Sequence, residues 1–564
     1  MAVTVIESNT PIDTEQNFLV KAGPGAGKTY WLIQHIKHVL STSNRLGKIK
    51  KIACITYTNI GVETIHNRLP DCAGRVDVCT IHSFLYDNII RPYFHFIAEE
   101  EGFAIDKLKV IDDTIMKGWK TLHDIKDTIN KKFYDDDKLK EALSLSTWRF
   151  VNGNLKFKPP YPIKSSRYPI SQSFYDEYKK YTWKRGVMHY DDVLYFAYKL
   201  IEKYPFIAHA ISVKYPYIFI DEFQDSTPVQ VEILKKMAST NFSVIGVIGD
   251  KAQAIYGFAG TDPKLFDKFS LKGMRIYEIQ GNRRSSEEII ALLNKIRSDL
   301  QQHSVNNIHS EKPILYVGDA ISCYNDFKTQ CCNTNITTLS YAKVTSNALR
   351  KQIGQIPQNE DLFNVIQDNN WDRIKVLINS VTAIEYALTG AIKDALKSIK
   401  KIVDDEHKQI MLISRMLKDY DTYKNQSLEF FLNYLKDDLK IEVTGLRSGT
   451  AKNFYSSKTY SDFALYVSSP DIKSLKDKTI HKAKGDEFEN VLVVLGEEAN
   501  IKFLTEPKLD GTKDEQRVYY VAVSRAAKRL AICVPTLSQE NENTLATLPK
   551  DKKRVKTRLK QMTD

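Results

Sequence analysis

The residues best suited to chemistry stand in short blocks, and the first block is a glycine-rich loop. It reads Ala22-Gly23-Pro24-Gly25-Ala26-Gly27-Lys28-Thr29. Its glycines let backbone N–H groups and the N-terminus of the next helix approach phosphate oxygens. Lys28 would reach the β- and γ-phosphates of ATP, and the Thr29 hydroxyl would bind Mg²⁺. The block predicts only a nucleotide site, because kinases and transporter ATPases carry the same loop.

Two further blocks supply carboxylates, an amide and aromatic rings. Asp221 and Glu222 follow the apolar run 217–220, which places them at the end of a buried strand. There Asp221 can hold Mg²⁺, and Glu222 can take a proton from the water that attacks the γ-phosphate. An acidic cluster is more often a solvated turn, but the apolar run favours the catalytic interpretation. The third block, residues 249–258, holds an amide to sense the γ-phosphate and two rings to stack on bases: Gln253, Tyr256 and Phe258.

Parallel β-strands are the elements expected to position these blocks. Continuous apolar runs indicate strands buried on both faces, and they occupy residues 18–20, 52–56, 217–220, 244–248, 491–495 and 530–534. Helix-like stretches separate them, which is typical of an α/β fold whose ligands bind at the carboxyl ends of the strands. Asp221, Asp250 and Gly496 each lie within two residues of such an end. The spacing therefore predicts that the chemistry gathers there.

The length of 564 residues is too great for one compact core and predicts several domains. Two stretches, residues 91–184 and 351–470, replace the α/β alternation with charged, aromatic and helix-like sequence. We interpret them as helical insertions, one in each of two α/β lobes. In the second stretch, apolar residues recur at helical spacing and predict one packed helix face: Ile384, Leu388, Ile392, Leu396, Ile399 and Val403.

Composition favours a polyanionic partner and a cytoplasmic location. The formal net charge is +12, and a nucleic acid would relieve the repulsion between the excess cations. We expect no membrane span, since no apolar run is long enough, and residues 1–7 do not resemble a secretion signal. The seven cysteines form no Cys-x-x-Cys pair, which favours reduced thiols over a metal site. The basic tail, residues 541–564, is expected to be a solvated end.

In their order along the chain, the blocks resemble the motifs of the UvrD/Rep-like superfamily 1A DNA helicases. Besides the three blocks above, the similar segments are 56–59 (motif Ia), 80–84 (Ib), 190–192 (leading to motif II), 282–285 (IV), 479–488 (V) and 515–526 (VI). The match spans nearly the whole chain apart from the two insertions. Asp191 and Asp192 lie in one of these segments but are expected to begin a helix or to line an interface, not to catalyse.

The resemblance implies an α/β fold of two RecA-like P-loop lobes with parallel sheets, each carrying a mainly helical insertion. It divides the chain into lobe 1A (residues 1–90 and 185–280), insertion 1B (91–184), lobe 2A (281–350 and 471–540), a reduced insertion 2B (351–470) and the basic tail (541–564). Both lobes would close around the nucleotide when it is hydrolysed.

Several site residues follow from the resemblance. Arg284 and Arg525 are the expected arginine fingers, which would come from the second lobe and contribute on the order of 10³ or more in rate. Glu487 would contact the nucleotide sugar or its surroundings. Single-stranded DNA would be bound by Thr56, Tyr57, Asn59, Thr80, His82, Tyr256, Phe258 and His481. A lone aromatic is more often part of a core, so packing of Tyr57 or Phe258 against neighbours remains the alternative.

Three positions depart from the family pattern. Ala259 stands where motif III often has arginine, so one phosphate or interlobe contact lacks its usual residue. Arg283 stands where motif IV usually has an aromatic residue, and it would cover the adenine by a cation–π contact. The upstream glutamine that reads adenine has no counterpart, because Gln16 lies too near the phosphate loop. Base selectivity is therefore expected to be looser than usual.

The leading hypothesis is an ATP- and Mg²⁺-dependent helicase that moves along single-stranded DNA, 3′-to-5′ by resemblance, and opens tailed duplex DNA in repair or anti-phage defence. The alternative is a DNA-end-sensing ATPase subunit that regulates a partner nuclease and unwinds weakly on its own. Ala259 and the short second insertion favour this alternative, and compact relatives include the helicase subunit of the Gabija anti-phage system. A fused helicase–nuclease is disfavoured, since no carboxylate-rich block follows motif VI.

Overall fold

The computed structural model describes residues 3–557 except 73, 109–117, 166, 258–259, 354–361, 369, 468–475, 512–513 and 548–555. The predicted DNA contact Phe258, the neighbouring Ala259 and most of the basic tail therefore lie outside the described residues. The chain forms two compact units. Unit 1 contains Met1–Arg284, Arg297–Asn306 and Lys508–Arg517, and unit 2 contains Ser285–Ile296, Asn307–Pro507 and Val518–Asp564.

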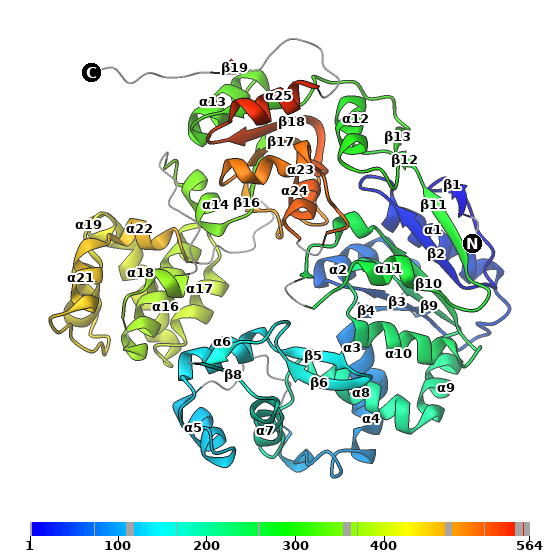
Figure 1. The fold of residues 1–564 in the computed structure, drawn as a ribbon, viewed down its shortest axis with the longest axis horizontal. Helices are drawn as coiled ribbons and strands as arrows, with labels where there is room; N and C mark the ends of the chain where they lie inside the picture. Colours follow the sequence, from blue (N-terminus) through cyan, green and yellow to red (C-terminus); the bar gives the residue numbers. More distant parts are fainter. Residues whose placement is uncertain are drawn as a thin grey trace. The chain divides into compact units, whose positions relative to one another are not determined.

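Unit 1 contains a seven-stranded sheet in which all neighbouring strands are parallel (Figure 1). Across the sheet the strands are β1 (Val3–Ile6), β11 (Arg275–Ile279), β2 (Phe18–Ala22), β10 (Val244–Gly249), β9 (Tyr217–Ile220), β3 (Ile52–Thr56) and β4 (Val76–Thr80). All side chains of β3, β9 and β10 are buried, as expected from their continuous apolar sequence. The four strands predicted in this part of the chain are confirmed.

Helices connect these strands, and local sequence explains where they begin. They are α1 (Lys28–Thr42), α2 (Asn59–Arg68), α3 (Ile81–Leu85), α8 (Asp192–Lys203), α9 (Pro205–Lys214), α10 (Pro228–Ala238) and α11 (Lys264–Lys268). The start of α10 is a capping box, in which the Thr227 hydroxyl accepts from the Gln230 N–H at 3.4 Å and the Gln230 side chain accepts from the Thr227 N–H at 2.9 Å. Pro228 occupies the first turn, where a missing N–H has no cost.

The first predicted insertion combines helices with two short hairpins. Its helices are α4 (Arg91–Tyr93), α5 (Trp119–Thr128), α6 (Asp136–Leu145) and α7 (Gln172–Trp183). The hairpins pair β5 (Thr147–Val151) with β6 (Asn154–Lys158) and β7 (Lys164–Ser165) with β8 (Tyr168–Pro169), both antiparallel. Asn152 and Gly153 join β5 to β6 with positive φ angles of 50° and 80°, which is the tight turn that such a dipeptide favours.

Unit 2 contains a second parallel sheet. Across it the strands are β16 (Asp477–Thr479), β15 (Ile336–Ser340), β17 (Phe488–Val494), β18 (Ala526–Val534), β14 (Ile314–Val317) and β19 (Lys556–Thr557). The helices around it are α12 (Glu287–Ile296), α13 (Ala320–Gln330), α14 (Lys343–Arg350), α23 (Lys502–Thr505), α24 (Glu515–Val523), whose first residues belong to unit 1, and α25 (Gln539–Thr547). The predicted strands at residues 491–495 and 530–534 correspond to β17 and β18.

The second predicted insertion is helical where it is described, but its apolar stripe is divided. Its helices are α15 (Leu362–Val365), α16 (Trp371–Leu388), α17 (Ile392–Ile399), α18 (Glu406–Lys418), α19 (Tyr420–Tyr423), α20 (Leu428–Asn433), α21 (Thr450–Ser457) and α22 (Tyr460–Ala464). The chain leaves the helix after Leu388, turns through Gly390 with φ 81°, and restarts at Ile392. Leu388 and Ile392 are 45% and 48% exposed. The prediction of one continuous packed face was therefore wrong.

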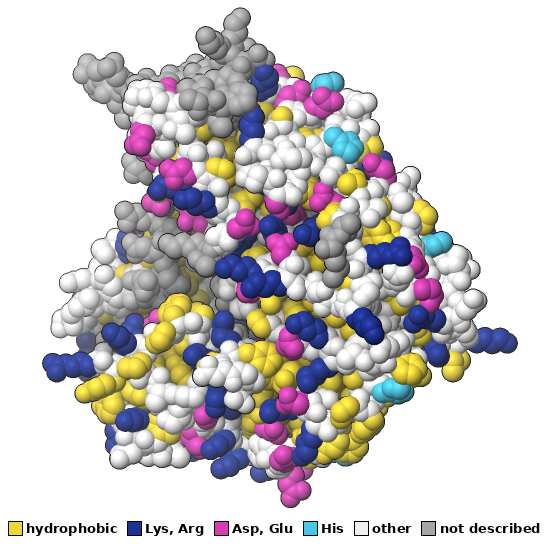
Figure 2. All heavy atoms as spheres, turned by 45° about the vertical axis from the view of Figure 1, so that its right-hand side comes forward, with side chains coloured by type: hydrophobic (Ala, Val, Ile, Leu, Met, Phe, Trp, Pro, Cys, Tyr) yellow, Lys and Arg dark blue, Asp and Glu magenta, His cyan; other side chains and the backbone are white. Residues whose placement is uncertain are grey.

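Charged side chains are mixed on the visible surface. On the face shown in Figure 2, Lys and Arg side chains are interspersed with Asp and Glu side chains. Positive side chains on that face therefore do not form one uninterrupted patch. Within the described ranges, no helix has the length and apolar character needed to cross a membrane.

Candidate nucleotide and nucleic-acid site

The phosphate loop joins β2 to α1 in unit 1. Gly25 and Gly27 have φ angles of 70° and 79°, a region that glycine adopts without strain. Lys28 then begins α1, and its ammonium donates hydrogen bonds to the carbonyls of Ala22 and Gly23 at 3.3 and 3.4 Å. The ammonium is thus held within the loop where phosphate contacts are predicted.

Thr29 and Asp221 meet although they are 192 positions apart in the chain. The Thr29 hydroxyl donates to Asp221 Oδ2 at 3.3 Å. Thr29 lies in the first turn of α1 and Asp221 follows β9, so the parallel sheet brings both to its carboxyl edge. Burial, reinforced by the charge of Glu222, raises the pKa of Asp221 to about 7. A hydroxyl and a carboxylate are oxygen ligands of the kind that Mg²⁺ prefers, so this pair fits the predicted ion.

A chain of hydrogen bonds joins Glu222 to Gln253. Gln224 donates through Nε2 to the Glu222 carboxylate, and its Oε1 accepts from the Asp250 N–H at 3.0 Å. The Asp250 carboxylate accepts from Gln253 Nε2 at 2.7 Å. Glu222 has φ 54°, an uncommon conformation for a residue with a side chain. The predicted water activator and the predicted γ-phosphate sensor therefore belong to one network.

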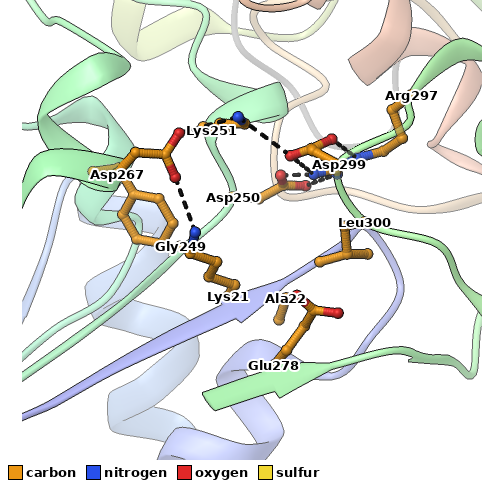
Figure 3. Close-up of a pocket in the computed structure, with 11 residues that line it drawn as sticks. Lys21, Ala22, Gly249, Asp250, Lys251, Asp267, Glu278, Arg297, Asp299 and Leu300 are labelled. Atoms are coloured by element: carbon orange, nitrogen blue, oxygen red, sulfur yellow. Dashed lines mark hydrogen bonds and ion pairs between the residues drawn. The ribbon is translucent and has the colours of Figure 1, made fainter. Parts of the chain in front are cut away.

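Arg297 anchors this network and was not predicted (Figure 3). Its Nη1 donates to both carboxylate oxygens of Asp250 at 2.9 and 3.1 Å, and its Nε and Nη2 each donate to Asp299 at 3.0 Å. Beside them, Lys251 forms ion pairs with the carboxylates of Asp267, Asp299 and Asp510. These contacts fix the orientation of the Asp250 carboxylate that binds Gln253.

The segment after β11 lies against the phosphate loop. Asn282 Nδ2 donates to the Pro24 carbonyl at 3.0 Å, and the Arg283 N–H donates to the Gly25 carbonyl at 2.9 Å. The Arg283 guanidinium donates through Nε to the Ser8 hydroxyl at 2.8 Å. Arg283, predicted to cover the adenine, is thus placed beside the phosphate loop and the residues that follow β1.

The two predicted arginine fingers fall in different units. Arg284 is grouped with the phosphate loop in unit 1, whereas we expected it to come from the second lobe. Arg525 belongs to unit 2, where it is 3% exposed and donates to the Asp486 carbonyl at 3.3 Å. The other predicted residues of unit 2 are Glu487, which is exposed, and His481, which is half-buried.

A short segment, residues 508–517, belongs to unit 1 although unit 2 residues flank it. Arg517 is 1% exposed and donates through Nε to the Ala254 carbonyl at 2.7 Å. The Asp514 carboxylate accepts at 2.7 Å from the N–H of the residue after Tyr256, and at 3.0 Å from Arg517. The segment therefore holds the Tyr256 loop on both sides, a role that no local sequence signal indicated.

Two aromatic pairs lie near the carboxyl ends of the strands. The rings of Tyr57 and Tyr256 stack with centroids 5.1 Å apart, and those of His82 and Tyr190 with centroids 4.0 Å apart. Tyr190 is 42% exposed and was missed, since its only signal was its position before Asp191. Burial lowers the pKa of His82 to about 4, so its ring stacks in the neutral form at pH 7. These pairs could extend a base stack.

The remaining predicted DNA contacts differ in how accessible they are. Asn59 is exposed at the start of α2. Thr56, at the end of β3, is 3% exposed. Thr80 caps α3 by accepting from the Ser83 N–H at 3.3 Å. Thr80 therefore has a structural role beside its predicted contact with DNA.

Asp191 and Asp192 connect α8 to the first insertion. The Asp192 carboxylate is fully buried and accepts from the indole N–H groups of Trp148 and Trp183 at 2.8 and 3.1 Å and from the Lys179 ammonium at 2.6 Å. The Asp191 carboxylate accepts from the Trp148 N–H at 2.7 Å. The prediction that this pair has a structural role is confirmed.

Known proteins match this chain along most of its length. The UvrD/REP helicase N-terminal domain matches residues 6–272, and the UvrD-like helicase C-terminal domain matches residues 251–536. Gabija protein GajB of Bacillus cereus (strain HuB5-5) is 23% identical, over 92% of this chain and 93% of GajB. The putative ATP-dependent DNA helicase YjcD of Bacillus subtilis (strain 168) is 22% identical, over 93% of this chain and 77% of YjcD.

ATP-dependent DNA helicase PcrA of Staphylococcus aureus (strain NCTC 8325 / PS 47) is 26% identical, over 50% of this chain and 38% of PcrA. Both helicase domains, the two parallel sheets and the phosphate loop confirm the expected α/β fold with RecA-like lobes. The chain belongs to the UvrD/REP-like family and is an ATP-hydrolysing DNA helicase.

Proposed function

We propose that this chain moves along single-stranded DNA in the 3′-to-5′ direction, in the cytoplasm, and opens tailed duplex DNA. One observation supports the proposal most directly. Gln253 is connected to Glu222 through Asp250, and three residues after Gln253, Tyr256 stacks on Tyr57. A change at the γ-phosphate would therefore reach the base-stacking surface through one short loop.

Each residue of the site would have a separate role in ATP hydrolysis. Thr29 and Asp221 would hold Mg²⁺, which when bound neutralises charge on the β- and γ-phosphates. The Lys28 ammonium would donate its hydrogen bonds to phosphate oxygens instead of to the carbonyls of the loop. Glu222 would orient the attacking water and accept its proton. Gln253 would respond to the loss of the γ-phosphate.

The test is Glu222→Gln, with Glu232→Gln on α10 as the matched control. The partly exposed Glu232 side chain forms an ion pair with Lys235. Glu232→Gln removes one negative charge, as Glu222→Gln does. We expect Glu222→Gln to lower DNA-stimulated ATP hydrolysis by about 10²-fold or more, with unchanged melting temperature and retained nucleotide binding. Wild-type turnover in Glu222→Gln would refute the assignment.

A second candidate function is a DNA-end-sensing ATPase that regulates a partner nuclease during anti-phage defence. The similarity to Gabija protein GajB along nearly all of both chains favours it. Strand displacement on tailed duplex DNA distinguishes the two: robust unwinding by the purified chain supports the autonomous motor. Stimulated ATP hydrolysis without unwinding, together with co-purification of a nuclease, supports the subunit.

A further inference from the structure

The first insertion brings a cation to the loop that follows Tyr256. Gly260 has φ 86°, and a Cβ atom there would lie 3.1 Å from Arg149 Nη2 and 3.3 Å from Thr147 Oγ1. Thr147 and Arg149 are alternate residues of β5, so they face the same side of the hairpin. Trp148, between them, is 8% exposed and packs in the core. The hairpin therefore presents Thr147 and Arg149 to the Gly260 backbone.

Several polar atoms of β5 and of the loop around Gly260 are left unsatisfied. In the described part of the chain, four buried side-chain atoms of β5 and of the loop that follows Tyr256 have no hydrogen-bond partner: Arg149 Nε, Arg149 Nη2, Thr147 Oγ1 and Thr261 Oγ1. An unsatisfied buried polar group costs about 1–3 kcal/mol, and more when it is charged. The guanidinium cannot avoid this cost by losing its proton. Such a cluster indicates that a ligand completes it.

The Asp191 carboxylate does not satisfy Arg149. The Asp191 carboxylate attracts Arg149 through space, but the two form no ion pair, and Asp191 already accepts from the Trp148 N–H at 2.7 Å. The unsatisfied guanidinium atoms can only donate, and the two hydroxyls beside them can donate as well. A partner for these atoms must supply several acceptor oxygens, and an anion would also balance the charge of the guanidinium.

We propose that Arg149, Thr147 and Thr261 form a binding site for a phosphodiester group of single-stranded DNA. A guanidinium fork matches two oxygens of a phosphate. Thr261 and Gly260 follow Tyr256 in the same loop, so a strand whose bases stack on Tyr256 would carry a phosphate nearby. This inference rests on the proposed function, since the polyanion is the strand that the helicase follows.

The first test is the salt dependence of oligothymidine binding, measured by fluorescence anisotropy without nucleotide. Arg149→Gln should weaken binding about tenfold and make the slope of log K against log salt shallower by about 0.7. Arg185→Gln is the matched control, because Arg185 is exposed and its guanidinium lies 3.4 Å from the centroid of the Tyr181 ring. An Arg149→Gln slope and affinity equal to those of the control would overturn the proposal.

The second test is Thr261→Val, which keeps the shape of the side chain and removes the hydroxyl. Because this hydroxyl has no partner in the described structure, its loss should leave the melting temperature unchanged or raise it. DNA affinity should fall severalfold, because the phosphodiester group loses the hydroxyl proposed to bind it. A lower melting temperature with unchanged DNA affinity would show that the hydroxyl serves the fold and would overturn the proposal.

Two controls separate this inference from the proposed function. A fluorescent ATP analogue should bind equally well to Arg149→Gln and to wild type. If Arg149→Gln loses as much affinity for the analogue as for oligothymidine, the anion site binds the nucleotide instead. Failure of the wild-type chain to bind oligothymidine would refute the proposed function itself. Normal wild-type binding with an unaffected Arg149→Gln variant would refute only the phosphate site.

Discussion

Arg297 and Asp250 form a buried ion pair in which one guanidinium nitrogen contacts both carboxylate oxygens, at 2.9 and 3.1 Å. Their side chains are 2% and 1% exposed. The same Asp250 carboxylate accepts from Gln253, so the ion pair helps to set the direction of the Gln253 amide, the predicted γ-phosphate sensor. We therefore predict that Arg297 is a positioning residue, which would act on hydrolysis through Asp250 and Gln253.

Removal of Arg297 should destabilise unit 1 and slow ATP hydrolysis. Loss of one partner of a buried pair typically costs about 3–5 kcal/mol, so Arg297→Met should lower the free energy of unfolding in urea by about 3 kcal/mol or more. The double variant Arg297→Met with Asp250→Asn removes the uncompensated charge and should recover part of that loss. A double variant less stable than Arg297→Met would contradict this explanation.

Lys28→Ala should abolish ATP hydrolysis without unfolding the chain, because the phosphate cradle loses its cation. The control is Lys37→Ala, which removes the same charge from an exposed position of α1. Turnover with and without single-stranded DNA, together with circular dichroism, checks both variants. Equal turnover in the two variants would contradict the role given to Lys28.

Tyr57→Ala should weaken binding of single-stranded DNA by about 1–3 kcal/mol, because each stacked base contributes that much. Tyr57→Phe keeps the ring and should retain most of the affinity. Equilibrium binding of a labelled oligonucleotide measures both. If Tyr57→Ala binds as tightly as wild type, the ring serves only to pack against Tyr256.

Asp191 should make the stability of the chain depend on pH. Burial, which dominates over the hydrogen bond from Trp148, raises the pKa of Asp191 from 3.8 to about 6. The folded chain therefore binds this proton more tightly than the unfolded chain, and the resulting stability is present below pH 3.8 and lost as the pH rises through about 6.

Asp191→Asn keeps an acceptor for the Trp148 N–H and has no charge to bury. It should be more stable than wild type above pH 6, by on the order of 3 kcal/mol, and should gain nothing near pH 4. Thermal unfolding at the two pH values measures this difference. A stability gain of the same size at both would show that titration of Asp191 is not its cause.

The central strands were predictable, whereas the outer ones were not. β3, β9 and β10 are buried on both faces, so their sequences are continuously apolar. The outermost strand β1 exposes three of its four residues, and β4 includes the half-buried Asp77, so neither has that signal. Likewise, Asn152-Gly153 marks a hairpin that we overlooked within a stretch that otherwise suggested helices.

The site was predictable where one motif holds the chemistry, and not where distant segments meet. The phosphate loop and the Asp221-Glu222 pair are contiguous in sequence. Arg297 is 47 positions from its partner Asp250, so only the folded chain brings them together. The apolar repeat around Leu388 misled the prediction because periodicity alone does not show that Gly390 ends the helix.

The division of the chain into units also bears on how the protein is synthesised. Unit 1 takes residues from three parts of the sequence, and the last of them, Lys508–Arg517, holds the Tyr256 loop. A nascent chain that has emerged only as far as residue 284 still lacks Arg297 and Arg517. The Tyr256 loop therefore gains its contacts with Asp514 and Arg517 only after residues 508–517 have been synthesised, more than 250 positions after the loop itself.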